Sequence, residues 1–582
     1  MDADFSLLHY PPCDQVTLTG RLSARYQGNL RYLQHIYETR EDWMLEPFRH
    51  RGMDWVLEPL RNKKGELAWA GEYAGKWLDA ASFSASHTSD KQLGQAAARF
   101  ASELIATQES DGYLGIELPV RRGQDPDWDW DVWNVKYVMA GLLTHYGTTQ
   151  DAASLHAAVR CGDWLINRFG MVSDADHPFF RSTMDGGSNV IVLDQFARLY
   201  RFSGEQKVLE FASAVVAHYP PLETMRNTCQ APIWHAYNLA GYLGGVVELA
   251  LASNKRTELI WLEKVWEDIA SRHLYPTGSI GFSEHLNATA PNDTPVENGE
   301  PARHHQETCA TVEWLLFNAV LFQATGRVRY MERMEQTIYN SLLAAQSLDG
   351  MQWMYFTPLR YEKRWFTGPT SCCYWSGPRG IARLPGWIYA LDNEGLRVNL
   401  YESGEATLQL RYNAVAIKQY SSYPDVGKVI LEIRPAAPVT FTLRLRIPLG
   451  AGQAQFKLNG EPVVPDSVTD GYFGFRRTWS QDDRISMKFD VPVTVSDFMH
   501  AHYGIVRRGP EVLAVDQQDN PGLDLDRITL PEQVTLSSID PINGRRRYQG
   551  KVQVDSGYRE ITFTPYADCG NDGSRFRVAF PK

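Results

Sequence analysis

The sequence predicts a multidomain protein in which an (α/α) barrel is followed by antiparallel β-sandwich domains. Three observations predict this fold class. The chain has 582 residues, more than the roughly 250–300 over which a single hydrophobic core grows. From about residue 20 to 395, apolar residues recur at three- and four-residue spacing, which is typical of helices. After about residue 395 they alternate with polar residues, which is typical of strands.

The helical half contains a recurring unit in which one helix ends, a short polar turn follows and another helix begins. The unit occurs as THYGTTQDAASLHAA from 144, RLYRFSGEQKVLEFA from 198, ELALASNKRTELIWLEKV from 248 and LFQATGRVRYMERM from 321. The copies start roughly 50 to 75 residues apart, which is too irregular for a short-period solenoid. Helical hairpins at this spacing suit a toroid of paired helices, and a generic helical bundle is the alternative.

The second half consists of strand-like segments separated by turn signals. They include LRVNLY, ATLQLRY, KVILEIR, VTFTLRLRI, ISMKFDV, VLAVDQ, GKVQVD and REITFTP. An early segment, QVTLTGRL at 15–22, has the same character and is expected to pair with a C-terminal sheet. We therefore expect an N-terminal strand segment (1–22), a helical domain (23–395), a β-sandwich domain (396–500) and a second sandwich or extension (501–582).

Charge and cysteine usage exclude several classes of protein. Basic residues number 58 and acidic residues 69, for a net charge of −11, which argues against binding to nucleic acid or an anionic membrane. No stretch approaches the roughly 20 apolar residues of a membrane span, and the opening MDADFSLLHYPPCDQ does not resemble a signal peptide. The 7 cysteines do not suggest a disulfide framework. These features predict a protein of a reducing compartment, the cytoplasm.

Four potential metal ligands lie in two short segments. Glu307 and Cys309 occur in HHQETCATVEW, and Cys372 and Cys373 occur in GPTSCCYWSGPRG. Three thiolates and one carboxylate would satisfy tetrahedral zinc. Glu307 and Cys309 are two residues apart and would face different ways on a regular helix. An extended or turning backbone is therefore needed for both to reach one ion.

Other readings of these segments remain open. Vicinal cysteines also occur in cores, because free cysteine behaves as a small hydrophobe. His304 and His305 are rival ligands in the same loop. The loop sequence WDWDVWN contributes Trp128, Trp130 and Trp133 as candidate platforms for sugar rings, or as a plug on the rim of the barrel.

Several motifs resemble glycoside hydrolase family 127, the β-L-arabinofuranosidases, from about Asn29 to about Pro510. They are GKWLDAASFS at 75, ATQESDGYLG at 106, DVWNVKYVMAGLL at 131, WHAYN at 234, YPTGSIGFSEHL at 275, ETCATVEW at 307, MYFTPL at 354 and SCCYWSGPRGIARL at 371. The resemblance implies an (α/α)6-barrel catalytic domain followed by β-sandwich domains. It also implies an exo-acting retaining hydrolase that uses a zinc-bound cysteine as nucleophile.

The resemblance also assigns roles to residues. It implies that Glu307, Cys309, Cys372 and Cys373 hold zinc, with Cys372 as the nucleophile, and that Glu284 in TGSIGFSEHL is the general acid/base. The stretch between Glu284 and Glu307 is longer than the family leads us to expect. That stretch contains two rivals for the acid role, Glu297 and Glu300.

The resemblance extends to the sugar-binding residues, with one departure. His235 in WHAYN and Tyr355 in MYFTPL match family positions near the sugar, and Trp133 is a candidate platform beside them. Asn134 stands where arabinofuranosidases carry a sugar-binding histidine, which weakens the assignment of the substrate but not of the chemistry.

The expected substrate is a β-L-arabinofuranoside of an oligosaccharide or glycoconjugate. Another pentose-like or acidic plant cell-wall sugar is an alternative for the same chemistry. A carbohydrate-binding scaffold with a structural zinc, and a two-carboxylate hydrolase or lyase on the same toroid, are further alternatives. The resemblance also leads us to expect a homodimer, because relatives form one.

Overall fold

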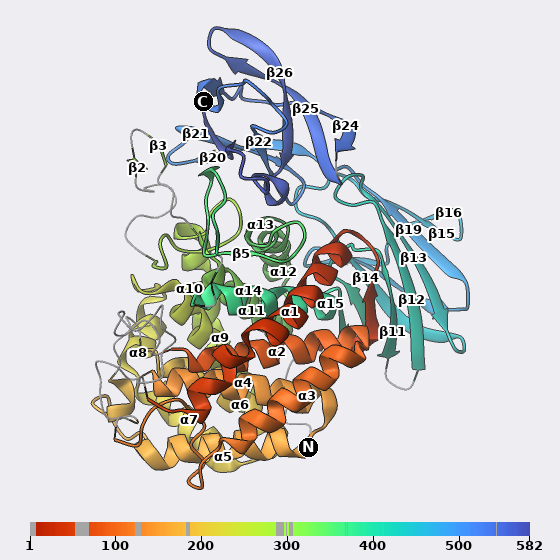
Figure 1. The fold of residues 1–582 in the computed structure, drawn as a ribbon. Coiled ribbons are helices and arrows are strands. Elements are labelled where there is room, and N and C mark those ends of the chain that lie inside the picture. Colours follow the sequence, from red (N-terminus) through yellow and green to blue (C-terminus); the bar gives the residue numbers. More distant parts are fainter. Residues whose placement is uncertain are drawn as a thin grey trace.

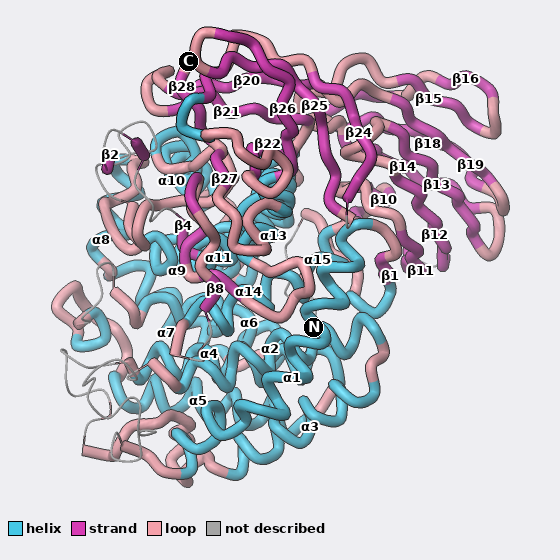
Figure 2. Tube along the Cα trace, turned by 45° about the horizontal axis from the view of Figure 1, so that its top comes forward, coloured by secondary structure: helices cyan, strands magenta, loops and turns pink. Residues whose placement is uncertain are grey.

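The computed structural model describes most of the chain. The described residues are 7–52, 69–120, 122, 130–181, 187–286, 296–297, 300–301, 306–366, 368, 370–410, 413–542 and 544–582. Trp128, His304 and His305 lie outside them. Helices fill the first two thirds and strands fill the last third, which confirms the predicted fold class (Figures 1 and 2).

The helical domain consists of paired helices arranged as two concentric rings. Its helices are α1 (Arg21–Arg49), α2 (Gly71–Thr88), α3 (Lys91–Ala106), α4 (Asp131–Thr149), α5 (Ala152–Phe169), α6 (Leu193–Ser203), α7 (Gln206–His218), α8 (Pro220–Thr228), α9 (Ala236–Ala252), α10 (Glu258–Arg272), α11 (Thr308–Thr325), α12 (Val328–Thr337), α13 (Leu343–Ala345), α14 (Cys372–Ala382) and α15 (Leu384–Trp387). Helices α2, α4, α6, α9, α11 and α14 contact one another in that order, and α14 returns to α2. The closed inner ring defines an (α/α)6 barrel, with the remaining long helices packed outside it (Figure 1).

The four polar turns identified in the sequence each lead from an inner helix to an outer one. They join α4 to α5, α6 to α7, α9 to α10 and α11 to α12. Inner helices are buried on nearly every face, as expected for helices surrounded by others. The closest approach is between α2 and α4, where a Cβ added at Gly75 would lie 1.8 Å from the carbonyl oxygen of Tyr137. Glycine at this position therefore allows the two backbones to touch.

Two sheets form a sandwich beside the barrel. One contains β1 (Val16–Leu18), β11 (Gly404–Leu410), β12 (Asn413–Ser421), β13 (Lys428–Pro435), β19 (Asp483–Lys488), β15 (Gln455–Leu458) and β16 (Glu461–Val463) in that order. The other contains β17 (Ser467–Thr469), β18 (Tyr472–Trp479), β14 (Val439–Arg446), β10 (Gly395–Val398) and β9 (Tyr389–Asp392). Alternate residues of β11 are buried, which is the pattern of a strand with one face toward a core. β10 runs parallel to β14, so the sandwich is not wholly antiparallel.

A third sheet ends the chain. It contains β20 (Val493–Phe498), β21 (Tyr503–Arg508), β22 (Glu511–Asp516), β26 (Gly557–Pro565), β25 (Arg545–Val554), β23 (Ile528–Thr529), β24 (Leu536–Ile542), β27 (Phe576–Arg577) and β28 (Ala579–Pro581). It is joined by β7 (Arg360–Tyr361) from the segment that precedes α14, because β7 pairs with β27. The strand β1 likewise links the N-terminal region to β11.

Short strand pairs precede α11 and α14 in the chain. They are β4 (Gln306–Glu307) with β6 (Phe356–Thr357), β5 (Trp353–Met354) with β8 (Trp365–Phe366), and β2 (Val296–Glu297) with β3 (Glu300–Pro301). None of the helices in the described part of the chain is long and apolar enough to cross a membrane.

Candidate active site and metal centre

Glu307 and Cys309 reach the same point because the backbone changes conformation between them. Glu307 ends the strand β4 with extended dihedrals (φ −72°, ψ 137°), and α11 begins at the next residue. Cys309 therefore lies in the first helical turn while Glu307 lies before it. Both side chains are buried, at 2% exposure each. Their two-residue spacing requires an extended or turning backbone if Glu307 and Cys309 are to reach one ion. The change from strand to helix provides it.

Cys372 and Cys373 begin α14, after the extended residue Ser371. Cys373 is fully buried and Cys372 is half-buried. The Sγ atoms of Cys309 and Cys373 are 3.4 Å apart, and those of Cys372 and Cys373 are 3.9 Å apart. Oε1 of Glu307 lies 3.6 Å from the Sγ of both Cys372 and Cys373. The structure thus brings all the predicted metal ligands together.

The donor set fits a metal ion. One ligand atom from each of Glu307, Cys309, Cys372 and Cys373 lies within 4.8 Å of every other. Oε2 of Glu307 is buried without a hydrogen-bond partner among the described residues, and an orphaned buried carboxylate oxygen is costly unless a cation meets it. Soft thiolates with one carboxylate suit tetrahedral Zn²⁺. The group could therefore hold such an ion.

Proton sharing within the cluster also favours cation binding. Hydrogen bonds with the Cys309 and Cys373 thiols lower the pKa of Cys372 well below its ordinary range. Burial raises the pKa of Glu307, Cys309 and Cys373 well above theirs. A cation would exchange with the protons that these buried groups otherwise retain, since metal ligands bind in their deprotonated forms.

Glu284 lies beside the cluster on a turn with unusual backbone geometry. Its φ is +74°, a left-handed conformation that is uncommon outside glycine and often found at functional sites. Its carbonyl oxygen accepts a hydrogen bond of 2.7 Å from the N–H of Ala236, the first residue of α9. Its side chain is 29% exposed. Glu284 is thus anchored by its backbone while its carboxylate stays accessible.

Two predicted substrate-binding residues, Tyr355 and His235, each contact one oxygen of the Glu284 carboxylate. The hydroxyl of Tyr355 donates to Oε1 over 2.5 Å. Nε2 of His235 lies 3.4 Å from Oε2. The Tyr355 hydroxyl also lies 3.8 Å from Sγ of Cys372. One hydroxyl therefore spans the space between the candidate acid and the candidate nucleophile.

Trp133 and Asn134, the other predicted substrate-binding residues, lie in the first turn of α4. Trp133 is 4% exposed and packs among Trp130, Tyr137 and Tyr237, with ring centroids 5.3 to 5.5 Å apart. Asn134 is fully buried. Both side chains are therefore part of the barrel wall and expose little surface to a ligand.

Glu72 and Lys76 of α2 are site residues that sequence reasoning missed. Nζ of Lys76 lies 2.8 Å from Oε2 of Glu72, and neither side chain is exposed. The same Oε2 accepts a 2.6 Å hydrogen bond from the indole N–H of Trp133. Lys76 also helps to lower the pKa of Cys372. In the sequence they appear only as opposite charges four residues apart, a spacing that is common on exposed helix faces.

The Asn134 side chain packs against the start of the same helix, α2. A Cβ added at Gly71 would lie 2.7 Å from Cγ of Asn134, so glycine at the start of α2 leaves room for the amide.

A carboxylate and a cysteine cluster of metal-ligand type, brought together at the helix N-termini of an (α/α)6 barrel, define a candidate carbohydrate hydrolase. Residues 15–386 match the family model of the β-L-arabinofuranosidase GH127 catalytic domain, and residues 395–491 match that of the GH127 middle domain. The chain belongs to glycoside hydrolase family 127, which confirms the resemblance seen in its motifs.

Individual relatives agree with this assignment. The chain is 23% identical over 527 residues to the non-reducing end β-L-arabinofuranosidase of Bifidobacterium longum subsp. longum, across 79% of this chain and 77% of the relative. The structure of a GH127 β-L-arabinofuranosidase from Geobacillus stearothermophilus T6 matches with a TM-score of 0.83 at 20% identity, covering 97% of this chain and 99% of that one. Another GH127 β-arabinofuranosidase structure matches with a TM-score of 0.83 at 22% identity, covering 100% and 98%. The two structures share the fold.

Proposed function

We infer that this glycoside hydrolase is an exo-acting retaining enzyme that releases β-L-arabinofuranose, with Cys372 as nucleophile and Glu284 as general acid/base. The observation that carries this proposal is the position of the Tyr355 hydroxyl, 2.5 Å from Glu284 and 3.8 Å from the Cys372 sulfur. In retaining hydrolases that use two carboxyl groups, the nucleophile and the acid are about 5–5.5 Å apart. Because Glu284 and Cys372 both lie beside the Tyr355 hydroxyl, they are at most about 6 Å apart, which is close to that range.

The reaction follows from the positions of these groups. The Cys372 sulfur attacks the anomeric carbon while Glu284 donates its proton to the leaving glycosidic oxygen, whose bond to that carbon breaks. Water then attacks the same carbon, Glu284 takes a proton from it, and the carbon–sulfur bond breaks. His235 and Tyr355 hold the two carboxylate oxygens and orient Glu284 through both steps.

The proposed cofactor is Zn²⁺, held by Glu307, Cys309, Cys372 and Cys373. Zinc bound there would keep the thiolates deprotonated at neutral pH, which both the nucleophile and its leaving step require. Glu307 supplies the one carboxylate, and its buried Oε2 has no other partner among the described residues.

The arabinofuranosyl specificity rests on the family and on the named relatives. His235 and Tyr355, which contact the Glu284 carboxylate, are the proposed contacts to sugar hydroxyls. We propose that Trp133 and Asn134 do not contact the substrate. Instead, Trp133 positions Glu72 through its hydrogen bond, and Asn134 packs against Gly71 at the start of α2. A different pentose-like or acidic sugar remains the alternative substrate, because Asn134 replaces the family histidine.

The test is hydrolysis of p-nitrophenyl β-L-arabinofuranoside by wild type, Cys372→Ala and a matched control. Cys161→Ala is that control, since Cys161 is another buried cysteine and lies on α5 outside the cluster. We expect about a thousandfold loss or more in Cys372→Ala and near-wild-type turnover in Cys161→Ala. Turnover by Cys372→Ala at the wild-type rate would remove cysteine from the mechanism. A third outcome is that no protein hydrolyses p-nitrophenyl β-L-arabinofuranoside but the wild type releases another sugar from a panel of furanosides and acidic pentosides. That outcome would overturn the proposed substrate and leave the proposed chemistry standing.

A further inference from the structure

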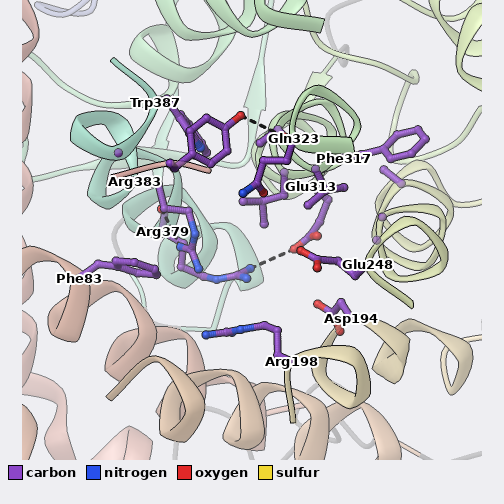
Figure 3. A pocket seen from close by; sticks show the side chains of 18 of the residues that line it. Phe83, Asp194, Arg198, Glu248, Glu313, Phe317, Gln323, Arg379, Arg383 and Trp387 are labelled. Atoms are coloured by element: carbon purple, nitrogen blue, oxygen red, sulfur yellow. Dashed lines mark hydrogen bonds and ion pairs between the residues drawn. The ribbon is translucent and has the colours of Figure 1, made fainter. Parts of the chain in front are cut away.

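A cavity lies on the barrel axis beyond the metal-type cluster. Its volume is about 350 Å³, within the range of small-molecule pockets. Arg379 and Arg383 stand on one wall, and Glu313, Glu248 and Asp194 stand across from them (Figure 3). The cavity is therefore lined by charges of both signs, with aromatic rings between them.

The cavity is separate from the proposed active site. Along α11, Cys309 belongs to the cluster, and Glu313, one turn later, already lines the cavity. Four residues of helix span about 6 Å. Arg379 and Glu313, which line the cavity, are fixed by buried ion pairs: Arg379 lies 2.9 Å from Asp79 and 3.0 Å from Glu313. A ligand in the cavity would not contact Cys372 or Glu284.

Nearly every charge around the cavity has a partner of opposite sign. The ion pairs are Arg379 with Asp79 and Glu313, Arg383 with Asp79, Lys136 with Asp194, and Arg201 with Glu248. These pairs contain equal numbers of cations and carboxylates, so they leave no carboxylate to balance a further cation.

Arg198 is that further cation. Its guanidinium donates to Oε1 of Gln195 and to Oγ1 of Thr144, each over 3.0 Å, and both partners are neutral. Among the described residues it has no carboxylate at ion-pair distance. Thr144 in turn donates to Oδ1 of Asp79 over 2.6 Å, so Arg198 reaches that carboxylate only through a hydroxyl. Burial lowers the pKa of Arg198 although Asp79 opposes the shift.

We propose that the cavity binds a small polyhydroxylated monocarboxylate, such as a sugar acid, with its carboxylate on Arg198. A guanidinium has five N–H donors, of which the two hydrogen bonds above use two. The remaining donors suit the paired oxygens of a carboxylate. Such a ligand would supply the negative charge that balances Arg198.

Two partly exposed carboxylates of the cavity explain why the ligand would carry hydroxyl groups. Asp194 and Glu248 are 20% and 15% exposed, and both line the cavity. Carboxylates accept hydrogen bonds from hydroxyls and repel a second negative charge. Phe317 and Trp387 offer apolar surface to a carbon skeleton. These walls select one carboxylate and several hydroxyls in a compact molecule.

The test is calorimetric titration of the metal-loaded enzyme with sodium D-galacturonate and with its neutral counterpart D-galactose. We expect galacturonate to bind once per chain and galactose to bind at least tenfold more weakly. Arg198→Gln should weaken galacturonate binding about tenfold or more, and Arg198→Lys should restore part of it. Arg434→Gln, on an exposed strand of the sandwich, is the matched control and should bind as wild type does. Binding should also persist in Cys372→Ala.

Equal binding of galactose, or unchanged galacturonate binding in Arg198→Gln, would overturn the proposal. A crystal of the wild type soaked in sodium bromide gives a measurement that needs no variant. An anomalous bromide peak beside Arg198 is expected. Absence of that peak would show that the cavity does not take a monoanion, even if Arg198→Gln fails to fold.

Discussion

The hydroxyl of Tyr355 donates to Oε1 of Glu284 over 2.5 Å. Tyr355 lies between β5 and β6, and its carbonyl oxygen accepts a hydrogen bond from the N–H of Thr308, next to Glu307. The backbone that orients this hydroxyl is therefore tied to the backbone that positions the metal ligands. Any change at Tyr355 acts on the proposed acid without removing a metal ligand.

Tyr355→Phe should lower kcat/KM by about tenfold to a hundredfold, because it removes one hydrogen bond to a charged group. The loss should fall mainly on kcat, since Glu284 is misoriented during proton transfer while the sugar still binds. Steady-state kinetics with metal content measured on the same preparation checks this. A rise in KM alone, with kcat unchanged, would assign Tyr355 to substrate binding only.

Glu284→Gln should depend on the leaving group. Methyl β-L-arabinofuranoside needs protonation of its leaving oxygen, whereas p-nitrophenol leaves with little help. We expect the variant to lose much more activity on the methyl glycoside than on the aryl one, and sodium azide to restore turnover of the aryl one. Glu297→Gln and Glu300→Gln, the rival acids, serve as controls. Equal losses on both substrates, or the leaving-group effect in a rival variant, would move the acid role away from Glu284.

Metal removal should affect the fold as well as the activity. Elemental analysis of the purified enzyme should give one zinc per chain, and a chelator should abolish turnover and lower Tm. Readdition of zinc should restore both. Glu307→Ala should reduce zinc content, because it removes the only carboxylate of the cluster, whereas Cys161→Ala should retain it. Full zinc content in Glu307→Ala would exclude that carboxylate as a ligand.

Asp79 should contribute stability that depends on pH. Burial acts to raise its pKa, but Arg383, Arg379 and Arg198 outweigh burial and lower it well below the ordinary value. A depressed pKa in the folded state gives stability that is present above the unfolded pKa of about 3.9 and is lost as pH falls through the folded pKa. Asp79→Asn should therefore lower the free energy of unfolding at pH 7 by about 3–5 kcal/mol.

Denaturant unfolding at several pH values checks this prediction. The difference between wild type and Asp79→Asn should be largest near neutrality and should shrink below about pH 3.9. A difference that does not change with pH would show that Asp79 acts through packing and not through its charge.

The architecture was predictable because the spacing of apolar residues differs between the two halves of the chain over long stretches. Each of the four polar turns marked a real junction between an inner and an outer helix. The parallel pairing of β10 with β14 was not predictable, because alternation of apolar residues is the same in parallel and antiparallel strands. The contribution of β7 to the third sheet was also hidden, since it is only two residues long and lies far from its partner β27 in the sequence.

The candidate site was predictable where its chemistry depends on rare residue types. Glu307, Cys309, Cys372 and Cys373 were found because thiols and a carboxylate cluster in two short segments. Glu72 and Lys76 were missed because a charged pair four residues apart on a helix usually faces solvent. Only the ring closure of the barrel buries that pair, and ring closure cannot be seen in a local pattern.

The two-residue strand β7 has a consequence for engineering. It continues the segment that carries Tyr355 and Phe356, and it is held at its far end by β27 of the last sheet. β6 in the same segment pairs with β4, which ends at Glu307. Truncating the chain before Val493 would remove β27 and leave β7 unpaired. The last 90 residues therefore cannot be exchanged between homologues as an independent binding module. Chimeras would have to transfer β7 together with the final sheet.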